Sequence, residues 1–141
     1  MGTLGTGVRP CSEGAGLTAQ EAIQAVRAVL TPTLLKPAFR RRVEGGAHPM
    51  TGHCYVAAEA VYVLLGGRAA GLKPASGVHE GGTHWWLVTA AGEIIDPTAD
   101  QFVTPVPYLQ GRCRGFLTRE PSARAREVLR LVEGQRGPAT Y

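Results

Sequence analysis

The chain has 141 residues, of which 44% are hydrophobic and 18% are charged, and its mean hydropathy is −0.04. These values are typical of one globular domain and exclude a disordered or fibrous chain. No stretch approaches the roughly 18 apolar residues of a membrane span, and the Gly-rich start lacks the apolar segment of a secretory signal. The three cysteines, Cys11, Cys54 and Cys113, include no CxxC pair, which argues against a disulfide framework. We therefore expect a cytoplasmic protein without a membrane partner.

The net charge of +4 comes from 13 Arg and 2 Lys against 11 acidic residues. The arginines gather in a run at 40–42 and in clusters at 112–119 and 124–130. Such clusters can bind phosphate groups. No helix-turn-helix, zinc-finger or aromatic-interleaved pattern accompanies them, so a solvated basic face is favoured over a nucleic-acid partner.

The first third of the chain predicts helices after a flexible N-terminal arm over 1–16. Thr18 and Glu21 have the spacing of a capping box, and apolar residues follow at helical spacing. This pattern predicts a helix over 18–30 that ends before Pro32. A second short helix, broken or begun by Pro37, is predicted within 32–42.

The segment 54–65 is apolar on every side except at Glu59. A helix that is apolar all round is a buried one, and Gly66-Gly67 supplies its C-terminal end. The sequence therefore predicts a central buried helix with Cys54 at its N-terminus.

A β-hairpin is predicted after a loop over 68–82. Aromatic and β-branched residues predict a strand over 83–89, and a tight turn at 90–92 leads into a returning strand over 93–96. If Thr89 faces Glu93 across this turn, the side chains of His84 and Asp96 point to the same side of the sheet.

The rest of the chain predicts an irregular stretch over 97–120 and a last helix over 122–133 that Gly134 ends. Residues 135–141 are expected to form a frayed tail. The fold class is then α+β, with a buried helix packed on an antiparallel sheet in a single domain over 17–134.

Cys54, His84 and Asp96 have the residue types of a catalytic triad. Free N–H groups and the positive end of the helix dipole at Cys54 stabilise a thiolate, which is the reactive form of cysteine. A histidine would serve as the base, and a carboxylate beside it would fix its tautomer and orientation.

The chain resembles the papain-like and transglutaminase-like superfamily of cysteine enzymes. The matching residues are Gly52-His53-Cys54-Tyr55, then His84-Trp85-Trp86 and Ile95-Asp96-Pro97-Thr98. The last of these motifs looks particularly like the transglutaminase core and the arylamine N-acetyltransferases. The resemblance implies a helix packed on an antiparallel sheet with the triad at their junction. It also implies thiol hydrolysis or acyl transfer on a peptide, a protein or a small amide or ester, without a cofactor.

Two positions depart from the family patterns. Tyr55 stands where transglutaminases usually have Trp, and no Gln lies between Gln24 and Cys54, where papain relatives supply an oxyanion donor. His48, His53 or backbone N–H groups are the remaining candidates for that donor.

Four further residues are candidates for the substrate cleft. Trp85 and Trp86 alternate faces of the strand, so one is expected in the core and the other beside the cleft. The Gly-rich stretch 71–82 leads into His84 and is expected to be mobile and to border the cleft, with His79 and Glu80 near the substrate.

Two alternatives remain open from the sequence. One is zinc bound by some of the imidazole and thiolate groups of His48, His53, Cys54, His79 and His84. The other is a non-enzymatic basic module that binds nucleic acid or a phosphorylated partner and in which Cys54 is inert.

Overall fold

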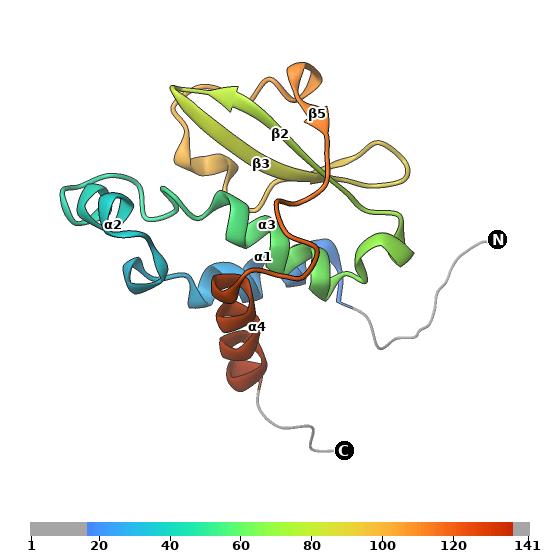
Figure 1. Cartoon of the computed structure of the whole chain (residues 1–141), viewed down its shortest axis with the longest axis horizontal. Helices are drawn as coiled ribbons and strands as arrows, with labels where there is room; N and C mark the ends of the chain where they lie inside the picture. Colours follow the sequence, from blue (N-terminus) through green and yellow to red (C-terminus); the bar gives the residue numbers. More distant parts are fainter. Residues whose placement is uncertain (1–16, 137–141) are drawn as a thin grey trace.

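A computed structural model describes residues 17–136 of the chain, so the predicted arm over 1–16, Cys11 and residues 137–141 lie outside the described part. The described residues form a mixed α+β fold in which helices pack against an antiparallel four-stranded sheet (Figure 1). No helix within 17–136 is long and apolar enough to cross a membrane.

The helices agree closely with the predicted ones: α1 Ala19–Val29, α2 Pro37–Glu44, α3 Cys54–Leu64 and α4 Ala123–Arg136. The capping box at α1 is confirmed, since the backbone N–H of Glu21 donates to Thr18 Oγ1 and that of Thr18 donates to Glu21 Oε1. α3 ends before Gly66, which adopts a left-handed φ of 100°. The predicted end of the last helix was wrong, because α4 continues through Gly134 to Arg136.

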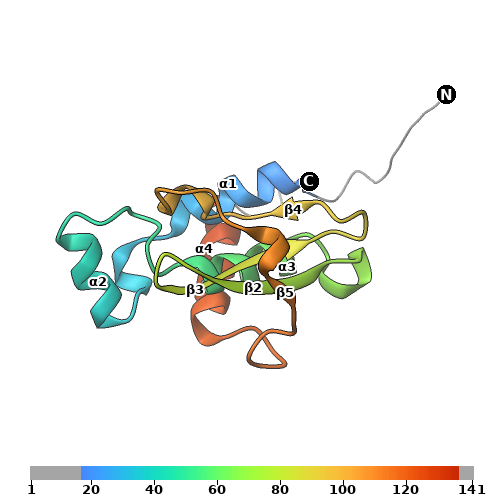
Figure 2. The same ribbon diagram turned by 90° about the horizontal axis from the view of Figure 1, so that it is seen from above.

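The sheet has the order β4-β3-β2-β5, with β2 Lys73–His79, β3 Gly82–Val88, β4 Ile94–Ile95 and β5 Arg112–Cys113. β3 pairs with β4 in the predicted register, with Leu87 opposite Ile95. Figure 2 shows this sheet from above, with α3 and α4 beneath it and α2 at one end of the molecule.

The predicted loop over 68–82 is largely a central strand, β2, which pairs with β3 on one side and β5 on the other. The expectation that 71–82 is a loop is therefore wrong over Lys73–His79. The glycine content of this segment suggested a loop, but Gly77 is needed for close packing within the sheet. A Cβ at position 77 would lie 3.2 Å from Trp86 and 3.3 Å from the backbone of Gly111. The stretch 97–120 is less irregular than predicted, since it holds β5 and two short 3-10 helices, η4 Ala99–Gln101 and η5 Tyr108–Gln110.

The core lies between α3, the flanking helices α1 and α4, and one face of β3. Ala57, Ala58, Ala60 and Val61 of α3 are fully buried, whereas Val63 is 42% exposed, so α3 is not buried on all sides. Glu59, the one charged residue in this helix, is buried and accepts hydrogen bonds from the Ser122 backbone N–H and hydroxyl. Burial raises the pKa of Glu59, and the Ser122 bonds oppose that rise. The buried carboxyl is thus paired and ties α3 to the start of α4.

Replacing Gly111 with Ala is expected to destabilise the fold. A Cβ at this position would lie 2.3 Å from two carbons of the Trp86 ring, and overpacking of this kind costs about 1–3 kcal/mol. Thermal unfolding measures the loss. Gly115→Ala is the matched control, because a Cβ there meets nothing within 4 Å. Equal unfolding temperatures for the two variants would contradict the close approach of β5 to Trp86.

Candidate active site

Three elements that are separate in sequence supply the candidate residues. Cys54 is the first residue of α3, His84 lies in β3, and Asp96 follows β4 directly. α3 packs against β3, which brings the start of the helix to the start of the strand (Figure 1). The Cys54 thiol lies 3.7 Å from the carbonyl oxygen of Thr83, the residue before His84.

His84 and Asp96 form a short buried hydrogen bond. Nε2 of His84 lies 2.6 Å from Oδ2 of Asp96, and the two side chains are 0% and 3% exposed. The register of β3 with β4, continued by one residue, explains the contact, since it puts both side chains on one side of the sheet. Because a carboxylate can only accept a hydrogen bond, Nε2 of His84 is the donor and carries a proton.

The Asp96 carboxylate accepts two further hydrogen bonds. The Tyr108 hydroxyl donates to Oδ2 at 2.8 Å, and the Thr98 backbone N–H donates to Oδ1 at 3.2 Å. The Thr98 bond is the local turn that Asp96-Pro97-Thr98 favours. Tyr108 is a site residue that the sequence analysis missed, because it lies in a proline-rich stretch where no local pattern points to Asp96.

The environment of His84 raises its pKa to about 9. Burial acts in the other direction and lowers the pKa, but the hydrogen bond to Asp96, the interaction with the Cys54 side chain and the charges of both groups outweigh it. Nδ1 of His84 has no hydrogen-bond partner among residues 17–136, since the Cys54 thiol is directed at the Thr83 carbonyl. Within this part of the chain the ring is thus held at Nε2 and has no partner at Nδ1, while the Cys54 thiol contacts the backbone of the preceding residue, Thr83.

The two histidine candidates for the oxyanion donor differ in their surroundings. His53, the residue before α3, is 1% exposed, and burial lowers its pKa to about 4, so the ring is neutral at physiological pH. Its Nε2 has no hydrogen-bond partner within the described part of the chain. His48 accepts a hydrogen bond from the Met50 backbone N–H at Nδ1, and its Nε2 lies 3.5 Å from Asp100. His48 is therefore engaged with Asp100.

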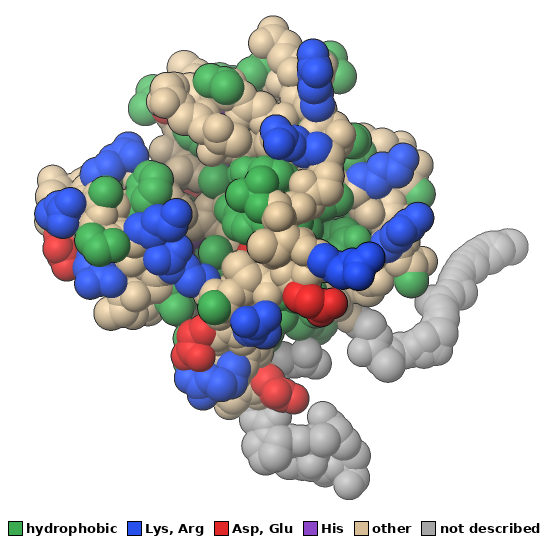
Figure 3. All heavy atoms as spheres, in the orientation of Figure 1, with side chains coloured by type: hydrophobic (Ala, Val, Ile, Leu, Met, Phe, Trp, Pro, Cys, Tyr) green, Lys and Arg blue, Asp and Glu red, His purple; other side chains and the backbone are tan. Residues whose placement is uncertain are grey.

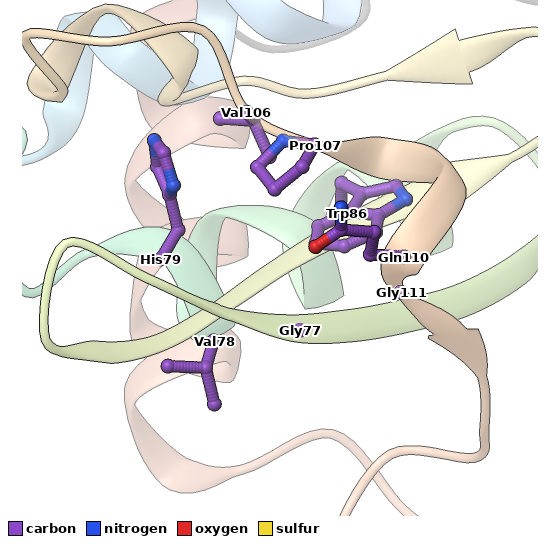
Figure 4. A pocket seen from close by; sticks show the side chains of 8 residues that line it. All are labelled: Gly77, Val78, His79, Trp86, Val106, Pro107, Gln110 and Gly111. Carbon is purple, nitrogen blue, oxygen red and sulfur yellow. The ribbon is translucent and has the colours of Figure 1, made fainter.

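The two tryptophans are both buried, on opposite faces of β3. Trp85 lies on the helix side, where its ring packs edge-on against Tyr55 at 4.9 Å and stacks on Phe116 at 5.8 Å. Trp86 lies on the other side, 5.7 Å from the His84 ring centroid, and lines a pocket of about 260 Å³ (Figure 4). The structure thus places Trp85 in the core and Trp86 between His84 and this pocket.

His79 and Glu80 hold the segment after η4 in place. Glu80 accepts hydrogen bonds from the Thr104 backbone N–H at 2.8 Å and from the Thr104 hydroxyl at 2.7 Å, and these bonds lower the pKa of Glu80. Nε2 of His79 lies 3.1 Å from the Thr104 carbonyl oxygen. Just before this anchor, Phe102 packs edge-on against the His84 ring at 4.6 Å. The tip of the β2–β3 hairpin therefore fixes the residue that covers His84.

The zinc hypothesis finds no ligand set in the structure. Within residues 17–136, no group of three or more His, Cys, Asp or Glu side chains is arranged to hold a metal ion.

The basic residues spread over one face around a central hydrophobic patch (Figure 3). Several arginines already have partners within the protein. Arg27 pairs with Asp100, Arg40 donates to the carbonyls of Pro32 and Leu35, and Arg114 lies over the Trp85 ring.

The chain matches no family model, no curated protein and no solved structure.

Replacing Asp96 with Asn is expected to lower the pKa of His84, because burial would no longer be opposed by the hydrogen bond to a carboxylate and by its charge. Titration of the imidazole signals by NMR measures this change. Asp100→Asn is the matched control, since that carboxylate binds Arg27 instead. An unchanged His84 titration in Asp96→Asn would contradict the assignment.

The same substitution is expected to change how the free energy of unfolding depends on pH. Since the folded-state pKa of His84 is raised from 6.5 to about 9, its stabilising contribution is complete below pH 6.5 and is lost as pH rises through about 9. We expect the difference in unfolding free energy between the wild type and Asp96→Asn to shrink over that interval in urea titrations. A difference that grows from pH 6.5 to 9 would be the contrary result.

Proposed function

We propose that this protein is a cysteine-dependent hydrolase of the peptidase or amidase type, or an acyltransferase, with a papain-like or transglutaminase-like core. One observation carries the proposal: His84 is bound to buried Asp96 through Nε2, its Nδ1 has no hydrogen-bond partner among residues 17–136, and the Cys54 thiol contacts Thr83, the residue before His84. A base oriented by a third group beside a nucleophile is the arrangement required for nucleophilic catalysis.

In the proposed resting state, the thiol proton has already passed to Nδ1 of His84, in keeping with the raised pKa of that ring, and in the first step Cys54 Sγ attacks the carbonyl carbon of an amide or ester as the thiolate. The C–S bond forms as the carbonyl π electrons move to oxygen. When the tetrahedral intermediate collapses, the bond to the leaving nitrogen or oxygen breaks, and the imidazolium gives its proton to that atom. A thioester on Cys54 and a free amine or alcohol result.

In the second step, His84 takes a proton from water, which attacks the thioester carbonyl. The C–S bond then breaks, a carboxylic acid is released, and the thiolate and imidazolium of the resting state are restored. In acyl transfer, an amine or alcohol would replace the water. Asp96 holds the ring and stabilises the imidazolium in both steps.

The oxyanion has two proposed donors. The backbone N–H of Cys54 belongs to the first turn of α3, where N–H groups lack helical partners. The buried, neutral ring of His53 is the second. Its Nε2 has no hydrogen-bond partner among residues 17–136, whereas Nε2 of His48 lies 3.5 Å from Asp100, and this supports His53 over His48. We propose a peptide, a protein or a small amide or ester as the substrate, with no cofactor needed.

The nucleophile can be tested by alkylation at neutral pH with iodoacetamide, followed by mass spectrometry of the peptides. Cys113 is the internal control, because it is exposed whereas Cys54 is half-buried. Accessibility alone would make Cys113 react faster; activation by His84 is expected to reverse that order, and His84→Gln is expected to abolish the reversal. A Cys54 that reacts no faster than Cys113 would contradict the proposal and favour a non-enzymatic basic module.

Turnover can be tested with a panel of fluorogenic peptide, amide and ester substrates. Cys54→Ala is expected to abolish turnover while the circular dichroism spectrum stays unchanged, and Cys113→Ser is expected to retain it. Asp96→Ala is expected to slow turnover roughly 10⁴-fold, by analogy with loss of the orienting carboxylate in serine triads. Equal rates for the wild type and Cys54→Ala would refute the mechanism.

A further inference from the structure

We propose that Tyr108 is a positioning residue of this site, whose hydroxyl shares one Asp96 oxygen with His84 and thereby limits how strongly Asp96 holds the His84 proton. The catalytic meaning of this inference rests on the proposed function. The effect of the Tyr108 hydroxyl on the Asp96–His84 hydrogen bond does not depend on that function, and it can be measured separately.

The sharing is explicit in the geometry. Oδ2 of Asp96 accepts both from His84 Nε2 at 2.6 Å and from the Tyr108 hydroxyl at 2.8 Å, while Oδ1 faces the Thr98 backbone N–H at 3.2 Å. The Asp96 side chain is 3% exposed, so these three protein donors take the place of hydrating water. Any change in one donor on Oδ2 must therefore alter the bond made by the other.

The backbone around Tyr108 holds the ring in place. Its N–H donates to the Val106 carbonyl at 2.9 Å, and its own carbonyl accepts from the Gly111 N–H at 3.0 Å. The ring packs edge-on against Trp86 at 5.1 Å, beside the pocket where Figure 4 shows Pro107 and Gln110. The hydroxyl thus reaches Asp96 from a packed ring on η5.

Tyr108 remains a donor across the working pH range. Burial raises the pKa of its hydroxyl, and the hydrogen bond to Asp96 raises it further, so the phenol stays protonated. A second donor on Oδ2 withdraws electron density from the oxygen that binds His84. Without it, Asp96 would stabilise the imidazolium more strongly, and that imidazolium would be a weaker acid toward a leaving group.

The groups that face His84 come from several elements, and only a few of them titrate. Cys54 approaches from α3 and Asp96 from the end of β4, and both enter the balance that sets the His84 pKa. Phe102 and Trp86 contribute apolar rings, at 4.6 Å and 5.7 Å. Tyr108 is therefore the one polar side chain, among the described residues that contact Asp96, that can tune His84 without touching it.

Tyr108→Phe tests the inference by removing only the hydroxyl. We expect the His84 imidazole to titrate about one pH unit higher by NMR, since a hydrogen bond to a charged group is lost. The alkaline limb of turnover should move up with it, and kcat should fall by several fold. Tyr62→Phe is the matched control, because Tyr62 is a half-buried tyrosine on α3 that packs on Phe116 away from Asp96.

A merely structural role would give a different result. Tyr108→Phe would then unfold at a lower temperature while the His84 titration stayed where it is in the wild type, and this outcome would overturn the proposal. Site-specific 3-fluorotyrosine at position 108 supplies a second measurement that keeps the ring. Its more acidic phenol is a stronger donor, so we expect the His84 titration to move down, and an upward movement would also count against the inference.

Failure of the inference can be separated from failure of the proposed function. A shifted His84 titration together with an unreactive Cys54 would retain the Tyr108–Asp96–His84 relation and remove the enzyme. A reactive Cys54 with an unshifted titration in Tyr108→Phe would retain the enzyme and remove the role of Tyr108.

Discussion

The buried hydrogen bond between His84 Nε2 and Asp96 Oδ2 is the interaction on which the arrangement of this site depends. An ionised carboxylate with 3% exposure is costly unless every oxygen has a donor. The protein meets that requirement from three directions: a strand supplies His84, the turn after β4 supplies the Thr98 N–H, and η5 supplies Tyr108. Removing any of these donors would leave the carboxylate charge incompletely compensated in a low-dielectric site. The chain from 96 to 108 therefore has to follow a path that keeps Thr98 and Tyr108 bonded to Asp96.

Close packing on the far side of the sheet supports the same bond. The Trp86 ring fits between His84 and Tyr108 because glycines occupy positions 77 and 111, where a Cβ would meet the indole at 3.2 Å and 2.3 Å. β5 can therefore pair with β2, and η5 just before it is held where the Tyr108 hydroxyl reaches Asp96. The apolar rings of Phe102 and Trp86 complete the enclosure and exclude solvent from the imidazole.

Local signals were sufficient to predict part of this structure. The apolar run ended by Gly66-Gly67 predicted α3 with Cys54 at its start, and the short turn at 90–92 predicted the register that joins His84 to Asp96. Two features could not be predicted, because each depends on residues distant in sequence. Gly77 lies in β2, where its lack of a Cβ leaves room for Trp86 and Gly111, and Tyr108 reaches Asp96 only through the path of the segment after η4. The catalytic roles of Cys54, His84 and Asp96 stay predictions.

The exposure of the three candidate residues bears on how reactants enter the site and products leave it. His84 is 0% exposed and the Asp96 side chain 3%, whereas Cys54 is half-buried, so sulfur is the member of this set that solvent reaches. The anchor of Glu80 on Thr104 holds the segment in which Phe102 packs against the imidazole. In the proposed reaction, the leaving group and the incoming acceptor would both have to reach Cys54 at the start of α3. The first product would then have to depart before the second reactant enters, which is the order of events in a ping-pong cycle.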